Sequence, residues 1–193
     1  LLKLGELCLK HGVIVISDEI HADFTYPGNR HLVFANLKPE FSEIAVTCTA
    51  PTKTFNLAGL HISNIFIANA DIRRRFKKEL TKCGCSQPNI MGITACRAAY
   101  TGGSEWLSEL KEYLSGNLDF LRSFLNQKLP QIKLVEPEGT YLAWLDFSAL
   151  GFDDNKLESF IENEAGLWLD SGTKFGAGGE GFQRINIACP RSV

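Results

Sequence analysis

Two short apolar runs, each closed by polar residues, constrain the fold of this 193-residue chain more than any other feature. Residues 13–16 are Val, Ile, Val and Ile, and residues 44–48 form a second run with strand character. Continuous, β-branched runs of this length are typical of strands that are buried in a parallel sheet. We therefore expect an α/β fold in which both strands end at one edge of a sheet, where open α/β sheets bind their ligands.

One aspartate and one lysine follow these two runs. Asp18 closes the first run, and Lys53 lies in a Thr- and Pro-containing segment just after the second. An amine at such an edge can form a Schiff base with an aldehyde, and a carboxylate can keep a pyridinium nitrogen protonated, which are the two protein groups that pyridoxal phosphate chemistry needs most. Alone, a lysine in such a loop is usually a solvated charge, and an aspartate after a strand is usually a turn former or a helix cap.

Four motifs, in order along the chain, resemble the class I and II aminotransferase superfamily, the fold-type I enzymes that use pyridoxal phosphate. The motifs lie at residues 11–21, 50–60, 140–146 and 181–192. The nearest branch is that of the MalY/PatB cystathionine β-lyases, which are C–S lyases, and the chain resembles the C-terminal half of such an enzyme. The resemblance implies an α/β fold: residues 1–108 as the C-terminal part of a large cofactor-binding domain with a mainly parallel sheet, and residues 109–193 as a smaller, truncated α+β domain.

The resemblance also implies a role for five residues. Lys53 matches the lysine that binds the cofactor aldehyde and acts in catalysis, and Asp18 matches the partner of the pyridine nitrogen. His21 stands where many aminotransferases place a tyrosine that hydrogen-bonds the phenolic oxygen, although a packed histidine in the turn after a strand is an equal alternative. Thr52 matches a hydroxyl that holds the cofactor phosphate. Arg184 matches the arginine that binds the substrate α-carboxylate, a task that suits a planar fork of donors.

Two residues depart from the superfamily pattern. Ala50 stands where a phosphate-binding serine is common, and His61 stands where many aminotransferases have a phosphate-binding arginine. The second departure is compatible with the lyase branch, so we expect a C–S β-lyase that cleaves a thioether amino acid to a thiol, pyruvate and ammonia. The alternatives are an aminotransferase, which would use the same residues, and a regulatory or binding module that keeps the fold.

Composition and charge limit the kinds of partner that we expect for this chain. The formal net charge is −2 and 45% of the residues are hydrophobic, with no transmembrane-length run and no basic stripe, so we expect neither a membrane nor a nucleic-acid partner. The six cysteines are scattered, and Cys83 and Cys85 lack a second pair to complete a zinc site, so we expect no metal and a reducing cytoplasm. The resemblance implies a small amino-acid substrate and a homodimer.

The remaining pattern predicts the other elements. Residues 1–8 have the spacing of an amphipathic helix that has already begun, so we expect a fragment, which by itself would bind the cofactor weakly, lack lyase activity and self-associate.

A glycine-rich segment at residues 170–181 leads into a strand rather than a helix, so we expect a flexible loop and not a dinucleotide site. The predicted helices are 70–83, 86–103, 104–129 and 154–164, and the further strands are 64–68, 132–135, 141–147, 167–169 and 182–188.

Overall fold

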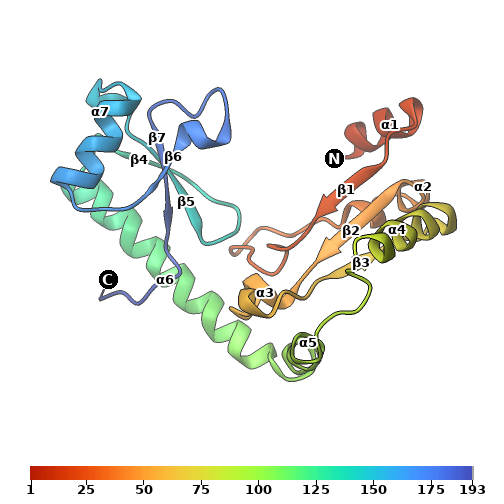
Figure 1. The fold of residues 1–193 in the computed structure, drawn as a ribbon. Coiled ribbons are helices and arrows are strands. Elements are labelled where there is room, and N and C mark those ends of the chain that lie inside the picture. The colour runs from red at the N-terminus through yellow and green to blue at the C-terminus, as the bar shows by residue number, and fades with distance from the viewer. Residues whose placement is uncertain (193) are drawn as a thin grey trace. The chain divides into compact units, whose positions relative to one another are not determined.

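The computed structural model describes residues 1–192, which form two compact units (Figure 1). Unit 1 contains residues 1–23 and 30–108, and unit 2 contains residues 24–29 together with the chain from residue 109 onward. Residues 24–29 were predicted to belong to the first domain, and the structure instead places them in unit 2. Thr25 forms an isolated antiparallel bridge with Gly139, and the backbone N–H of Tyr26 donates to the carbonyl of Glu138 at 3.0 Å, so backbone hydrogen bonds attach this short segment to unit 2.

Unit 1 is a three-stranded sheet with helices. Its strands, in order across the sheet, are β1 (Val15–Asp18), β2 (Ala45–Thr49) and β3 (Asn64–Phe66). Its helices are α1 (Leu2–His11), α2 (Pro39–Ser42), α3 (Pro51–Thr54), α4 (Ala70–Lys82) and α5 (Ile90–Gly102). The predicted parallel pairing of the first two strands is confirmed, and β3 runs antiparallel to β2, so the sheet is mixed.

The buried core of unit 1 joins α1 and α2 to the sheet. Phe34, Phe41 and Ala45 form its centre, and the rings of Phe34 and Phe41 stack with their centroids 5.1 Å apart. The ring of Phe41 lies so close to Gly5 that a Cβ atom on that glycine would approach ring carbons to 2.3 Å. Only glycine therefore allows α1 to pack this closely on α2.

The strand β1 is less buried than its apolar sequence predicted. Val13 and Ile14 precede the strand and are exposed, and Ile16 within it is 73% exposed. Burial of a strand requires a layer that packs on its face, and residues 1–192 supply none on the side that carries Ile16. The prediction of a buried strand is therefore wrong for this chain, although the prediction of a parallel strand is right.

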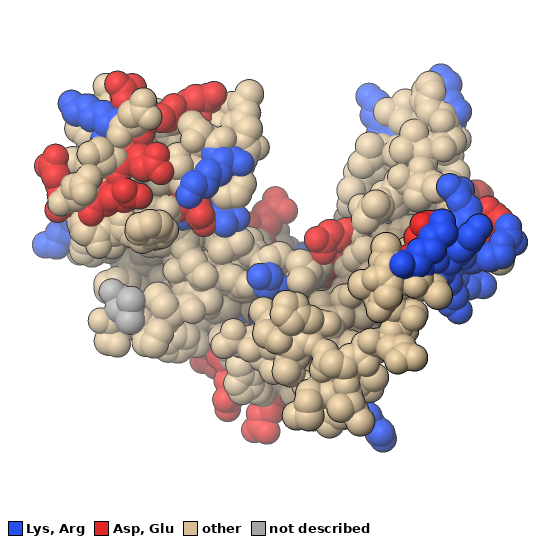
Figure 2. Space-filling model, viewed as in Figure 1, with Lys and Arg blue, Asp and Glu red and all other residues tan. Residues whose placement is uncertain are grey.

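Lysine and arginine side chains gather over α4 (Figure 2). The helix begins at the predicted place, where the Asn69 side chain accepts hydrogen bonds from the backbone N–H groups of Asp71 and Ile72. Two of its cations pair with carboxylates of the same helix, Arg74 with Asp71 and Lys82 with Glu79. The basic face of α4 is therefore partly neutralised by carboxylates of the same helix.

Unit 2 is a four-stranded antiparallel sheet packed on the long helix α6 (Ser104–Lys128), which begins in unit 1. Across the sheet the order is β4 (Lys133–Val135), β5 (Leu142–Asp146), β7 (Phe182–Asn186) and β6 (Asp170–Ser171). The helix α7 (Asp154–Ser159) continues into a π-helical turn at Phe160–Glu164. Buried side chains of α6 pack against buried side chains in and next to the sheet strands and form two clusters. The residues of these clusters are Leu118, Leu125, Ile132, Ala143, Leu145 and Ile187.

One prediction about the segment before β7 is wrong. Residues 167–169 form no strand, and Trp168 is 87% exposed. The strand β6 instead begins directly after this range, where Asp170 and Ser171 pair with β7. Some glycines in the following segment form turns, and others allow two stretches of backbone to pack closely. A Cβ atom on Gly172 would lie 2.1 Å from the carbonyl oxygen of Gly179, so a close backbone contact requires glycine at both positions.

Candidate active site

Asp18 and Lys53 lie at the same edge of the parallel strand pair in unit 1. Asp18 is the last residue of β1 and stands opposite Cys48 of β2 in the parallel register. The strand β2 ends at Thr49, and α3, which carries Lys53, begins at Pro51. The topology therefore brings the two residues to one edge of the sheet, as the positions of the two apolar runs predicted.

The backbone around Lys53 is anchored while its side chain is exposed. Pro51 and Thr54, on either side of it in α3, are both almost fully buried. The hydroxyl of Thr54 donates to Asp23 Oδ2 at 2.7 Å, which ties α3 to the segment that follows β1. Within residues 1–192, the Lys53 ammonium has neither a hydrogen-bond acceptor nor an ion-pair partner. Its position is thus set by the backbone, and its amine is available to react.

Asp18 is exposed and forms part of a turn. Its Oδ1 accepts a hydrogen bond from the backbone N–H of Ile20 at 3.2 Å, which is the turn role that an aspartate after a strand often has. The charge of Asp18 also acts on the neighbouring strand β2. The pKa of the Cys48 thiol is raised mainly by burial and, to a smaller extent, by the negative charge of Asp18. A carboxylate can accept about four hydrogen bonds, so one turn bond leaves acceptor sites for a ligand.

Two further predicted residues accompany this pair. His21 is half-buried in the turn after β1 and interacts with neighbouring groups of the chain. Thr52 is half-buried directly before Lys53, and its carbonyl accepts from the N–H of Leu57 at 2.9 Å. His61, one of the two departures from the family pattern, is exposed and has a left-handed backbone with φ of 47°.

A buried carboxylate next to Asp18 was not anticipated. Glu19 is 6% exposed, and alternation along an extended chain turns it to the face opposite Asp18. Its oxygens accept from the Ser17 hydroxyl at 3.0 Å and the Phe34 N–H at 3.3 Å, and one lies 3.0 Å from His31 Nε2. Glu19 therefore fixes the loop after β1, and nothing in the adjacent Asp–Glu pair indicated which carboxylate would be buried.

A hollow of about 470 Å³ opens on the Glu19 side of the sheet. Asp23, Thr49, Asn64 and Tyr100 are among the residues that line it. Burial, followed by the charge of Asp23, raises the pKa of the Tyr100 hydroxyl, which hydrogen-bonds to Thr49 and Asn64. Neither Lys53 nor Asp18 lines this hollow, so it is separate from the candidate pair.

Arg184 is held from two sides in unit 2. It lies in β7, where the register places Asp170 of β6 on one side and Trp144 of β5 on the other. Its Nη2 donates to Asp170 Oδ2 at 2.7 Å, and its guanidinium carbon lies 4.5 Å from the centroid of the Phe175 ring. The hydrogen bond from Arg184 holds the pKa of the Asp170 carboxyl below its usual range, so this carboxyl is ionised at neutral pH.

Arg191, the nearest alternative for binding a substrate carboxylate, is tied into the framework. Its Nε and Nη2 both donate to Asn117 Oδ1, at 3.2 and 3.1 Å, and its backbone N–H donates to the Tyr113 hydroxyl at 2.9 Å. Asn117 is buried and also donates to the carbonyls of Ile187 and Cys189. These bonds connect α6 to the end of β7, which is a structural task.

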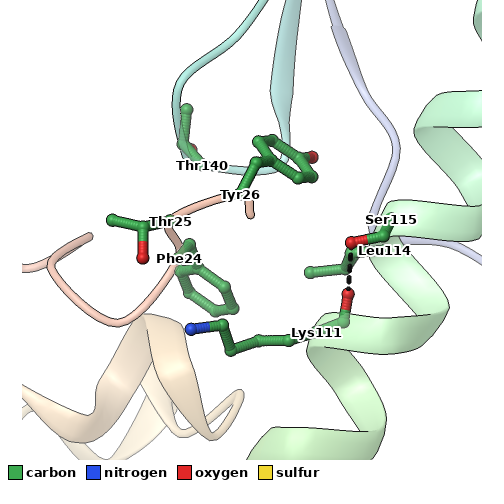
Figure 3. A pocket seen from close by; sticks show the side chains of 7 residues that line it. All are labelled: Phe24, Thr25, Tyr26, Lys111, Leu114, Ser115 and Thr140. Carbon is green, nitrogen blue, oxygen red and sulfur yellow. Dashed lines mark hydrogen bonds between the residues drawn. The ribbon is translucent and has the colours of Figure 1, made fainter. Parts of the chain in front are cut away.

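A separate small pocket in unit 2 contains none of the candidate residues (Figure 3). Phe24, Tyr26, Lys111 and Thr140 are among its lining residues, and the Ser115 hydroxyl at its wall donates to the Lys111 carbonyl at 2.9 Å. Its volume of about 10 Å³ holds no more than a water molecule. Within residues 1–192, no group of His, Cys, Asp and Glu is arranged to hold a metal ion.

Comparison with known proteins agrees with the motifs and the fold. The family model described as aminotransferase class I and II matches residues 1–192. The cystathionine β-lyase PatB of Bacillus subtilis is 47% identical over 98% of this chain and 49% of its own length.

Two solved structures have the same fold. A putative aminotransferase of Clostridium difficile with bound pyridoxal phosphate has a TM-score of 0.96 and 43% identity, over 98% of this chain and 49% of its own. Cystalysin of Treponema denticola, which contains pyridoxal 5′-phosphate, has a TM-score of 0.95 and 39% identity, over 99% of this chain and 48% of its own. The chain thus spans about half the length of these relatives. Because the family model covers almost the whole sequence, the chain belongs to the class I and II aminotransferase family.

Proposed function

We propose that the protein carrying this chain is a pyridoxal phosphate-dependent C–S β-lyase, which cleaves a thioether amino acid such as cystathionine to a thiol, pyruvate and ammonia. The observation that carries the proposal is the placement of Lys53 and Asp18 at one edge of a parallel strand pair, in a chain that is 47% identical to a cystathionine β-lyase. The similarity extends over 98% of this chain.

The residues of unit 1 have the donor set that this cofactor requires. Lys53 offers an exposed amine for the aldehyde, and Asp18 offers carboxylate oxygens for a protonated ring nitrogen. The Thr52 hydroxyl lies next to Lys53 in the chain and is the proposed partner of the phosphate, and His21, in the turn after β1, is the proposed partner of the phenolic oxygen. The chemistry of these groups fits pyridoxal phosphate, and their roles follow from that fit.

The residues divide the work of the reaction. When bound, pyridoxal phosphate supplies an electron-withdrawing ring joined to the substrate amine. Lys53 Nζ holds the cofactor between turnovers and takes the proton from the substrate Cα. Asp18 keeps a proton on the ring nitrogen, and Arg184 donates hydrogen bonds to the substrate α-carboxylate. An exposed amine without a fixed partner suits proton transfer, because Nζ must move between the cofactor and Cα.

An aminotransferase is the second candidate, because a putative aminotransferase is among the most similar structures. It would use the same five residues and return the proton to a different carbon. His61, which stands where many aminotransferases have a phosphate-binding arginine, favours the lyase.

One assay separates the candidates. The whole protein, loaded with pyridoxal phosphate, is incubated with L-cystathionine while pyruvate and free thiol are measured together. A lyase releases both in equal amounts without a keto-acid acceptor. An aminotransferase requires the acceptor and releases no thiol. Failure to bind the cofactor, seen as the lack of a visible absorbance band, would leave only the binding-module alternative.

We further propose that the protein acts in the cytoplasm as a homodimer. Large apolar side chains that are exposed in unit 1 support self-association, among them Ile16 at 73%, Phe66 at 61% and Ile90 at 76% exposure. Light scattering of the whole protein after size-exclusion chromatography measures this directly, and a monomeric mass at micromolar concentration would contradict it.

A further inference from the structure

Asp170 lies between two cations in unit 2. Cross-strand pairing in the β6–β7 register puts it directly opposite Arg184, whose Nη2 is 2.7 Å from Asp170 Oδ2. Lys174 Nζ lies 3.8 Å from the other carboxylate oxygen, Oδ1. Two cations and one carboxylate leave one formal positive charge, so the cluster can accept one more carboxylate without becoming negative.

Arg184 uses fewer of its donors than Arg122, a well-anchored arginine of the same unit. Arg122 makes three hydrogen bonds to carboxylates: two to Glu136, each 2.8 Å long, and one to Asp119 at 2.5 Å. Arg184 makes one such bond, to Asp170, and its Nε is buried without a partner among residues 1–192. A guanidinium carries five N–H donors, so most of those on Arg184 are not used within the described chain.

The orientation of Arg184 therefore depends on few contacts. The Arg184 Nε–H is buried without an acceptor, which costs free energy, so the hydrogen bonds of Arg184 within the described chain do not by themselves favour this side-chain orientation. Asp170 fixes one end of the guanidinium, and the Phe175 ring supports its plane at 4.5 Å. Trp144 packs against Phe175 with the ring centroids 5.4 Å apart and so holds the supporting ring in place. The side chain remains 30% exposed, which leaves part of the fork accessible.

We propose that Asp170 is a positioning residue for substrate recognition: its single hydrogen bond holds the Arg184 guanidinium so that the unused donors receive the α-carboxylate of the amino-acid substrate, and Lys174 offsets the charge that Asp170 adds. The proposal rests on the proposed function, in which Arg184 binds that carboxylate. Asp170 acts through Arg184 and does not itself contact the substrate. It therefore affects substrate affinity more than the rate of the chemical step.

The test compares an amine that has a carboxylate with one that lacks it. The whole protein loaded with pyridoxal phosphate is titrated with L-alanine and, separately, with ethylamine, and binding is followed by the change in visible absorbance. In Asp170→Ala the Kd for L-alanine rises about tenfold, as expected for the loss of a hydrogen bond that orients a charged group, and the Kd for ethylamine stays unchanged. The KM for L-cystathionine rises with it, while kcat stays within about twofold. Asp170→Asn retains an acceptor oxygen and recovers most of the affinity.

Glu136→Ala is the matched control, because it removes a carboxylate from a structural arginine of the same unit. It lowers thermal stability slightly and leaves both titrations unchanged. If folded Asp170→Ala binds L-alanine as tightly as the wild type or more tightly, or if Asp170→Asn is as impaired as Asp170→Ala, the positioning role is wrong. If wild-type protein shows no absorbance change with L-alanine, the proposed function itself fails, and the role of Asp170 fails with it.

Discussion

The two cations proposed to act on the substrate, Lys53 in unit 1 and Arg184 in unit 2, are held in opposite ways. For Lys53 the backbone is anchored through the buried Pro51 and Thr54, and the side chain is exposed with no partner in the described chain. For Arg184 the side chain itself is fixed, by Asp170 at 2.7 Å and by Phe175 at 4.5 Å.

The difference corresponds to two kinds of work. A base that moves a proton between atoms needs a mobile amine on a fixed support, whereas recognition of a planar carboxylate needs a fork that is already oriented. In unit 1 the sheet topology positions Lys53, whereas in unit 2 side-chain contacts position Arg184. The two arrangements predict different responses to mutation.

The largest effect is expected at Lys53. In the whole protein, Lys53→Ala should lose the visible absorbance of the lysine-bound cofactor and reduce turnover by at least about a thousandfold, because no other group replaces its covalent and proton-transfer roles. Borohydride reduction of the wild type followed by peptide mapping should place the cofactor on Lys53. Lys38→Ala, which removes a surface lysine paired with Glu6, is the control and should be active. An adduct on any other lysine would contradict the assignment.

Asp18→Asn should have the next largest effect. The amide oxygen can still accept the turn hydrogen bond from Ile20, so the substitution removes mainly the charge. We expect Cα deprotonation to slow about a hundredfold while the cofactor is retained, since a neutral amide does not keep the ring nitrogen protonated. Single-turnover exchange of a Cα deuterium measures the rate. An unchanged rate would leave Asp18 as a turn residue only.

Substitution of Arg184 and of Arg191 distinguishes an arginine that binds substrate from one that stabilises the fold. Arg184→Lys retains the charge but loses the planar fork, so the KM for L-cystathionine should rise by about ten- to a hundredfold. Arg191→Lys should instead lower the melting temperature, because it disrupts the bonds to Asn117, and should change KM little. Steady-state kinetics and thermal unfolding of both variants give the answer, and the opposite pattern would reverse the two roles.

The anchor beneath Lys53 can be weakened without changing the lysine. Thr54→Val keeps the shape of a fully buried side chain but removes the hydroxyl that donates to Asp23 Oδ2. Loss of this bond should reduce the free energy of unfolding by about 1–3 kcal/mol, because the Asp23 carboxylate loses a donor. Thr54→Ser keeps the hydroxyl and is the control. Equal stability of the two variants in urea unfolding would show that the bond does not anchor α3.

The smallest effect is expected at the exposed pair Arg122–Glu136, and it should depend on pH. Arg122 holds the pKa of the Glu136 carboxyl below its usual range, so folding is favoured above the pKa of the unfolded chain and the gain is lost as the pH falls through the lowered value. Glu136→Gln should therefore cost less than about 1 kcal/mol at pH 7. The difference from the wild type in urea unfolding should vanish on acidification. A difference that grew with acid would contradict the sign.

The sequence alone determined the elements that depend on local chemistry. Asn69 marked the start of α4, and the two apolar runs marked the strands whose parallel pairing carries Asp18 and Lys53. The motifs were sufficient to identify the family, because the residues that contact a shared cofactor lie in short segments with fixed spacing.

The tertiary structure decided everything that depends on contacts between distant residues. It exposed Ile16, buried Glu19 beside the exposed Asp18, and moved the predicted strand at residues 167–169 to Asp170 and Ser171, because burial and register depend on what packs alongside. It also placed Asp170 against Arg184, fourteen positions apart in the chain. No local pattern in the sequence specifies such a pair, since cross-strand register arises only when the strands meet.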